Sequence, residues 1–114
     1  MKLIRITLLT FVVALAFSSL ARAQSDQPLA IIMTADGPVM PPMLAYFERG
    51  IKSAEQQNAE VLIIQLNTPG GSVDTMLEII QVMRASTVPV VVYVSPNDAI
   101  AGSAGALITI AGHV

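Results

Sequence analysis

Three short apolar runs, separated by segments of helical periodicity, constrain this chain most strongly. The runs are Leu29 to Met33, Val61 to Leu66 and Val90 to Val94. A continuous apolar run is typical of a strand buried on both faces, as in a parallel sheet. Parallel strands need crossover connections, which are usually helices and almost always right-handed. The pattern therefore predicts an α/β fold built on a parallel sheet.

The segments between the runs carry the helical signals. The first predicted apolar stripe consists of Leu44, Phe47, Ile51 and Ala54. Pro41 and Pro42 fit the first turn of that helix, where no N–H is needed. Ser72 is the expected N-cap of the second helix, whose apolar stripe is Met76, Leu77, Ile80 and Met83. A last, tightly packed helix is predicted over 99–111.

Charge and cysteine content exclude several classes of protein. The chain has 114 residues, of which 12% are charged and 54% hydrophobic, so intrinsic disorder is not expected. It has no cysteine, which excludes disulfide scaffolds and thiolate metal sites. With 6 basic and 8 acidic residues it lacks the basic footprint of nucleic-acid binders. We expect no metal, no cofactor and no nucleic-acid partner.

The N-terminus has the three parts of a secretory signal. Lys2 and Arg5 precede a nearly uninterrupted apolar segment, 6–20, and Ala21 to Ala23 offers small residues for cleavage before Gln24. A membrane anchor is the alternative, but spanning a bilayer takes about 20 apolar residues, more than this segment provides. The sequence predicts a removed signal over 1–23, a mature domain over 24–114 and action outside the cytoplasmic membrane. We also expect that domain to be incomplete and unstable alone, because three crossover units cannot cover both faces of a sheet.

Two small-residue loops follow predicted strands, at the sheet edge where α/β proteins place their sites. The first, Thr68-Pro-Gly-Gly71, is either an ordinary strand-to-helix turn or a set of N–H groups that binds an anion or oxyanion. No Lys-Ser/Thr pair follows the glycines, so it is not a P-loop. The second, Ala101-Gly-Ser-Ala-Gly105, either exposes Ser103 on a tight turn or is a close-packed helix face with Ser103 as its cap.

Three strings together resemble the NfeD family of ClpP-class, membrane-bound serine proteases encoded beside stomatin-like proteins. They are Leu66-Asn-Thr-Pro-Gly-Gly-Ser72, Val88-Pro-Val-Val-Val-Tyr-Val94 and Ala99-Ile-Ala-Gly-Ser-Ala-Gly105. The resemblance runs from about Leu29 to Val114. It implies a ClpP/crotonase-like fold, a spiral of β-β-α units with a parallel sheet. The family usually has Asp, Ala and Thr where this chain has Asn67, Gly102 and Ala106.

The resemblance also implies roles for individual residues. Ser103 matches the nucleophile, Gly71 with Gly70 beside it matches the oxyanion-hole glycine, and Ala104 supplies the second N–H. The family's base is a lysine several tens of residues beyond the serine, whereas the lysines here are Lys2 and Lys52. The base is therefore missing, and this fragment is expected to be inactive.

Two residues need separate interpretation. Lys52 lies off the apolar stripe of its helix, and we interpret it as a solvated surface charge. His113 suggests a Ser-His-Asp triad, but ten residues of helix would separate it from Ser103 by about 15 Å. A structural histidine is the better interpretation.

The predicted function is an extracytoplasmic serine endopeptidase that uses a Ser/Lys dyad on hydrophobic peptide segments. The partners implied are such a peptide, a stomatin-like membrane protein and further copies of the chain in a homo-oligomer. The alternative is a non-catalytic interaction domain of a membrane scaffold partnered with a stomatin-like protein. A crotonase acting on acyl-CoA thioesters is a third hypothesis, which the secretory signal disfavours because those substrates are cytoplasmic.

Overall fold

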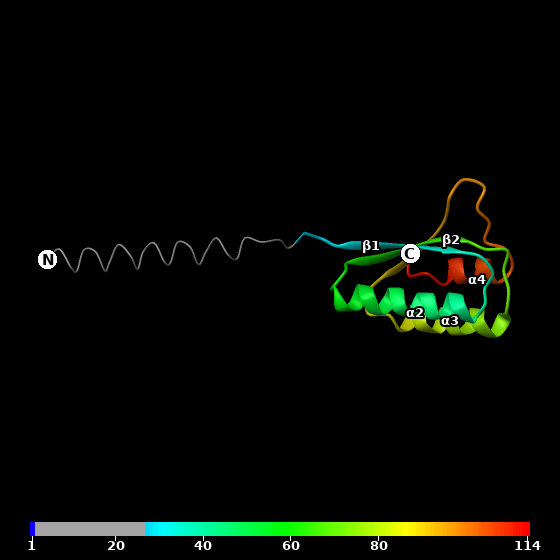
Figure 1. Ribbon diagram of the computed structural model, residues 1–114, viewed down its shortest axis with the longest axis horizontal. Coiled ribbons are helices and arrows are strands. Elements are labelled where there is room, and N and C mark those ends of the chain that lie inside the picture. Colours follow the sequence, from blue (N-terminus) through cyan, green and yellow to red (C-terminus); the bar gives the residue numbers. More distant parts are fainter. Residues whose placement is uncertain (2–26) are drawn as a thin grey trace.

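Strands and helices alternate along the chain in the computed structural model, which describes residues 1 and 27–114 (Figure 1). The elements are β1 (Ala30–Asp36), α2 (Pro41–Gln56), β2 (Val61–Asn67), α3 (Val73–Ala85), β3 (Val90–Val94) and α4 (Ala104–Ile110). The predicted signal over 1–23 and the cleavage point before Gln24 lie outside the described residues. No helix within the described part of the chain is both long and apolar enough to cross a bilayer.

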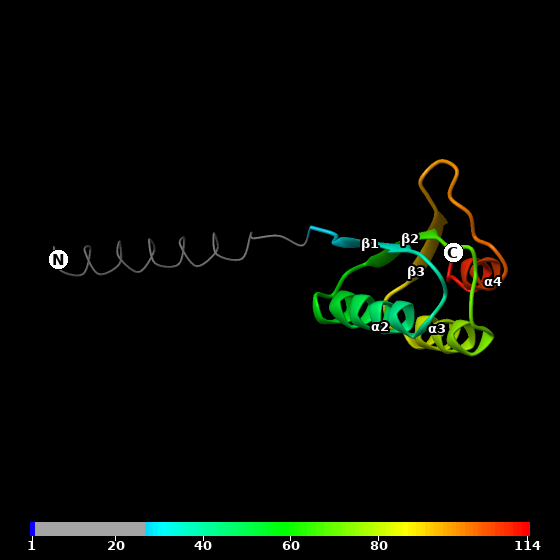
Figure 2. The ribbon, with the colours of Figure 1, turned by 45° about the vertical axis from the view of Figure 1, so that its right-hand side comes forward.

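The three strands form one parallel sheet in the order β1-β2-β3, which confirms the predicted α/β class. Val61 pairs with Ala30, and Leu62 pairs with Val90, so the carboxyl ends of β1 and β2 reach the same edge together. Helices α2 and α3 lie side by side along one face of the sheet, and α4 packs against α3 and β3 (Figure 2).

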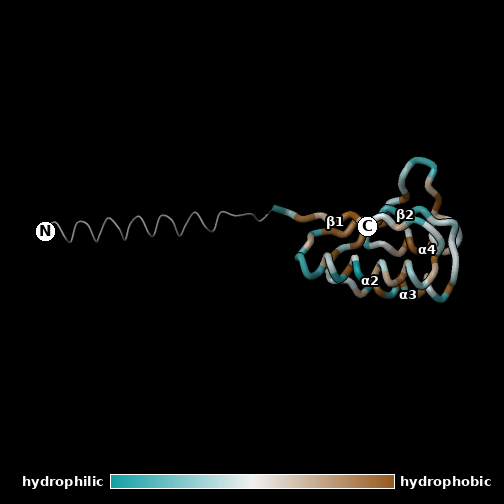
Figure 3. The backbone as a smooth tube through the Cα atoms, viewed as in Figure 1, coloured by the Kyte–Doolittle hydropathy of each residue, from teal (hydrophilic) through white to brown (hydrophobic). Residues whose placement is uncertain are grey.

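Only one face of the sheet is covered within 27–114. On the helical side, Leu62, Ile64 and Leu66 of the central strand are fully buried. On the other side, Ile32 is 60% and Tyr93 58% exposed. The expectation that the apolar runs form strands buried on both faces is therefore wrong at Ile32 of β1 and Tyr93 of β3, because both crossover helices lie on the same side. Figure 3 shows β1 as a largely apolar strand at the sheet edge.

The helix signals are largely confirmed. Pro41 and Pro42 open α2, and the Thr75 N–H donates to Ser72 Oγ (3.3 Å) at the start of α3. Phe47 is completely buried between α2 and the sheet. In α3 the stripe is rotated: Leu77, predicted as core, is 55% exposed, whereas Ile79 is fully buried. Packing against α2 and α4 on two sides sets this rotation, which the periodicity alone did not resolve.

Two element boundaries differ from the prediction. β1 continues through Ala35 and Asp36, because their backbones pair with Leu66 and Asn67 of the central strand. The last helix begins at Ala104 and not at Ala99. Residue Ala101 instead forms a parallel bridge with Thr68, and this pairing holds the segment before the helix in an extended form.

Candidate active site

The two small-residue loops lie against each other at the carboxyl edge of the sheet. The Thr68 N–H donates to the Ile100 carbonyl (2.7 Å), and the Gly102 N–H donates to the Thr68 carbonyl (2.9 Å). The backbones of the two loops therefore pair with each other as neighbouring strands do. This contact fixes the position of Ser103 relative to the glycine pair.

Gly70 is in direct contact with the turn that carries Ser103. Its φ of +103° is a conformation that favours glycine. A Cβ at this position would lie 2.8 Å from the Gly102 carbonyl oxygen and 2.9 Å from Ser103 Cβ. Any side chain at position 70 would therefore displace the serine.

Gly71 directs its N–H away from the segment that pairs with the glycine loop. On the other side, Val39 pairs with it: the Val39 N–H donates to the Gly70 carbonyl (2.9 Å), and the Ser72 N–H donates to the Val39 carbonyl (2.8 Å). The Gly70 carbonyl and the Gly71 N–H belong to one trans peptide group and point in opposite directions, so the Gly71 N–H points away from Val39. Among the described residues, neither this N–H nor that of Ala104 has a hydrogen-bond partner.

Ser103 has a backbone conformation that is rare for a residue with a side chain. Its φ is 48° and its ψ is −112°, immediately before the first residue of α4. Its side chain is exposed and does not cap the helix. Strain of this kind costs about 1–3 kcal/mol and persists where the surroundings enforce it, most often at functional sites. A serine held exposed on a strained strand-to-helix turn has the geometry of a nucleophile elbow.

Thr68 holds the two loops together, a role that the sequence analysis missed. Its side chain is fully buried, and its Oγ1 accepts a hydrogen bond from the Gly70 N–H (3.1 Å). Its methyl group fills the space that a side chain at Gly105 would need. The Gly70 N–H therefore already has a hydrogen-bond partner. Gly70 serves the site through its positive φ, which allows the close contact with the Ser103 turn. The sequence Thr-Pro-Gly, with a hydroxyl side chain two residues before the glycine, is the signal that could have indicated this turn.

We predict that Thr68→Val lowers the free energy of unfolding by about 1–3 kcal/mol, because it leaves the buried Gly70 N–H without a partner. Thr68→Ser keeps the hydroxyl, so the amides of the 66–71 segment should stay as protected from hydrogen exchange as in the wild type. Thr34→Val is the matched control, since the Thr34 hydroxyl bonds Gln65 at the surface and should change stability by less than about 0.5 kcal/mol. Urea unfolding and hydrogen exchange of the full-length protein measure these effects. Equal values for Thr68→Val and Thr34→Val would contradict the prediction.

His113 and Lys52 lie away from the two loops. The Val90 N–H donates to His113 Nδ1 (3.1 Å), and the His113 N–H donates to the Val90 carbonyl (2.8 Å). The histidine thus completes the hydrogen bonds of Val90, at the amino end of β3. Ser103 lies in the segment that follows the carboxyl end of the same strand. This favours the structural interpretation of His113. Lys52 is an exposed residue of α2.

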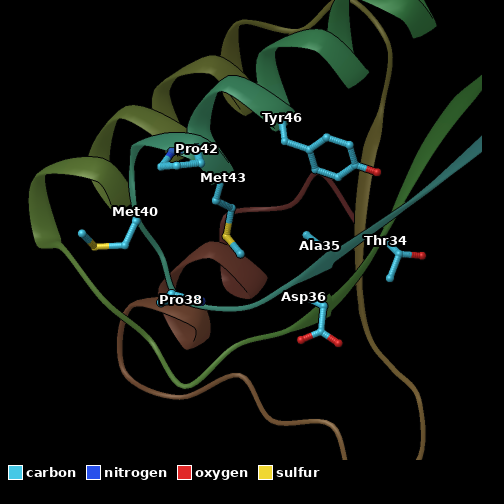
Figure 4. Close-up of a pocket in the computed structure, with 8 residues that line it drawn as sticks. All are labelled: Thr34, Ala35, Asp36, Pro38, Met40, Pro42, Met43 and Tyr46. Atoms are coloured by element: carbon cyan, nitrogen blue, oxygen red, sulfur yellow. The ribbon is translucent and has the colours of Figure 1, made fainter.

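An apolar pocket of about 380 Å³ lies between the end of β1 and the start of α2 (Figure 4). It is lined by Thr34, Ala35, Asp36, Pro38, Met40, Pro42, Met43 and Tyr46. Pro38 and Met40 flank Val39, the residue that pairs with Gly71. The pocket wall and the glycine loop are therefore parts of one hydrogen-bonded unit.

Comparison with known proteins identifies the family. The sequence model of the NfeD1b N-terminal domain matches residues 29–113. The chain belongs to this family. The predicted resemblance is thereby confirmed, and it covers all three strands and all three helices described above.

Two curated relatives are similar in sequence. Membrane-bound protease PH1510 of Pyrococcus horikoshii is 48% identical over 68 residues, which are 60% of this chain and 15% of that protein. Membrane protein NfeD1b of Bacillus subtilis is 27% identical over 93 residues, 81% of this chain and 21% of that protein. Both relatives are named as membrane proteins, one of them as a protease, and this chain spans less than a quarter of the length of each.

Solved structures show the same fold. A mutant of the 1510-N membrane-bound stomatin-specific protease with serine changed to alanine matches with a TM-score of 0.77 at 37% identity, over 78% of this chain and 43% of that one. A mutant with lysine changed to alanine, in complex with a substrate peptide, matches with a TM-score of 0.76 at 38% identity, over 78% and 41%. The chain therefore has the fold of part of that protease domain.

Proposed function

We propose that this chain provides the nucleophile and the oxyanion hole of a serine endopeptidase. The observation that carries the proposal is Ser103, exposed and strained, with Gly70 against it and with no partner among the described residues for the N–H groups of Gly71 and Ala104. The membership of a family that includes a protease supports it. The domain 24–114 would then be the N-terminal part of the protease domain.

The chemistry assigned to these residues is acyl transfer. Ser103 Oγ forms a bond to the carbonyl carbon of the peptide while its proton passes to a general base. The oxygen that becomes negative accepts hydrogen bonds from the Gly71 and Ala104 N–H groups. The C–N bond then breaks, the amine leaves with the proton, and water later hydrolyses the ester. The base implied by the family is a lysine several tens of residues beyond the serine.

The substrate and the location follow from the family and the signal. We propose that the enzyme cleaves peptides, because a structural neighbour is named a stomatin-specific protease and was solved with a substrate peptide. That these peptides are hydrophobic segments is what the family resemblance implies. A stomatin-like membrane protein is the corresponding partner. Removal of residues 1–23 during export would place the site outside the cytoplasm. A Ser/Lys dyad and homo-oligomeric assembly belong to the same proposal.

Covalent labelling tests the nucleophile directly. A fluorophosphonate probe should modify the full-length gene product, which under this proposal includes the base, once. Mass spectrometry of the digest should place the added mass on the peptide that contains Ser103. An activated serine displaces the leaving group from phosphorus, whereas an ordinary serine hydroxyl does not react. Ser72 and Ser95, in the neighbouring loops, serve as internal controls. Absence of labelling at Ser103 in the folded protein would favour the non-catalytic interaction domain instead.

A further inference from the structure

Asn67 connects three segments at the edge of the sheet next to the Ser103 loop. Its Oδ1 accepts a hydrogen bond from the Ile100 N–H (3.1 Å), and its Nδ2 lies 3.4 Å from Asp36 Oδ1. The strand register independently places Asp36 directly opposite Asn67. One side chain therefore bridges the ends of β1 and β2 and the loop 95–101.

The Asp36 carboxylate determines which end of the Asn67 amide faces the loop. A carboxylate only accepts hydrogen bonds, so it attracts the NH2 group and leaves the carbonyl oxygen for the Ile100 N–H. The Ile100 carbonyl in turn accepts from the Thr68 N–H (2.7 Å). Ile100 is thus held on both sides, three residues before Ser103.

We propose that Asn67, oriented by Asp36, is a positioning residue for the 95–101 segment that leads to Ser103. This inference rests on the proposed function of that serine. An aspartate at position 67 would position the loop less well in this chain. Two carboxylates directly opposite each other on neighbouring strands repel, and neither can donate to the other. The side chain at position 67 would then move, and with it the acceptor of the Ile100 N–H.

The repulsion has a defined pH dependence. Above the range in which carboxyl groups titrate, both groups of Asn67→Asp are charged and the loop is displaced. As the pH falls, the folded protein takes up one proton more readily than the unfolded chain, because this proton removes the repulsion. The deficit relative to wild type should therefore shrink toward acid pH.

Other ionisable groups near this pair are few among the described residues. Tyr46 shares the pocket lining with Asp36, and Arg49 lies 5.9 Å from the Tyr46 ring. Tyr93 pairs with Gln65, two residues before Asn67 on the same face, and Asp98 belongs to the loop itself. Asp98→Asn in the Asn67→Asp background tests whether that carboxylate contributes to the pH response.

The experiment compares four variants of the full-length protein by peptide hydrolysis between pH 4.5 and 8 and by hydrogen exchange of the 95–101 segment. Asn67→Asp should lower kcat/KM about fivefold at pH 7, with faster exchange of the segment, and should approach wild type at acid pH. Adding Asp36→Asn should restore both readouts at pH 7, because the introduced amide donates to the introduced carboxylate. Asn67→Leu should show a lower kcat/KM and faster exchange of the 95–101 segment at every pH. Gln65→Glu is the matched control, because it adds one negative charge two residues before Asn67 on the same face of β2.

Three results would overturn the proposal. They are wild-type exchange of the 95–101 segment in Asn67→Asp, the absence of rescue by Asp36→Asn, and a loss in Gln65→Glu as large as in Asn67→Asp. Hydrogen exchange decides on the positioning of the loop whether or not peptides are cleaved. Absence of hydrolysis by the wild-type protein with the expected exchange pattern would count against the proposed function, and not against the link between Asn67, Asp36 and Ile100.

Discussion

Ser103→Ala is expected to abolish peptide cleavage by the full-length protein and to leave its stability unchanged. The loss should approach the roughly 10⁶-fold seen when the nucleophile of another serine protease is removed. The fold should persist, because the Ser103 side chain is exposed and makes no capping hydrogen bond, and alanine keeps the same Cβ in the same strained conformation.

Ser95→Ala is the matched control, since it removes a hydroxyl from the loop that leads to Ser103 without touching the proposed site. Turnover of a hydrophobic peptide and the thermal unfolding midpoint are the two measurements. Full turnover by Ser103→Ala would show that the hydrolytic mechanism is wrong. A common loss in both variants would point to the loop as a structural element.

Gly71→Pro should lower kcat by at least roughly 10²–10³-fold, the effect of removing one oxyanion donor. The Gly71 N–H has no partner among the described residues, so its removal breaks no internal hydrogen bond. A Cβ at this position would however overlap the Val39 backbone, with the Val39 nitrogen and carbonyl carbon both 2.8 Å away. The substitution therefore acts on catalysis through the lost donor and through a displaced loop.

Comparison with Gly71→Ala separates these contributions, because alanine introduces the same overlap and keeps the N–H. Gly112→Ala is the control, since a Cβ there would meet its neighbours at ordinary distances of 3.4 Å or more. Initial rates and hydrogen exchange of the 39–41 and 68–72 segments are the readouts. If Gly71→Pro and Gly71→Ala show equal exchange and equal rates, the Gly71 N–H is not a catalytic donor.

The site was partly predictable from sequence because its conspicuous residues lie in short, local patterns. Two adjacent glycines after one strand and a serine among small residues after the next mark Gly71 and Ser103 without any tertiary information. Asn67 was not assigned a role in the site, because its side chain acts through contacts with residues about 30 positions away, Ile100 and Asp36. Thr68 bonds the nearby Gly70 N–H, but its backbone also pairs with the distant residue Ile100. No local pattern encodes the contacts with Ile100 and Asp36.

Local physics also determined several elements of the fold by itself. The β-branched run from Val90 to Val94 is a strand with the predicted bounds, and the consecutive prolines open α2. The hydroxyl of Ser72 caps α3 as expected. In each case the residue's own conformational preference and its immediate neighbours agree with the final structure, so tertiary contacts had nothing to override.

Tertiary structure decided what depends on pairing between distant segments. β1 reaches Asp36 because the central strand supplies partners for its backbone, and α4 begins only at Ala104 because Ala101 pairs with Thr68. The rotation of α3, which buries Ile79 and exposes Leu77, is set by two neighbouring helices. Backbone hydrogen bonds and burial are satisfied by whichever segments meet in space, and the local sequence around each segment does not contain the identity of its partner.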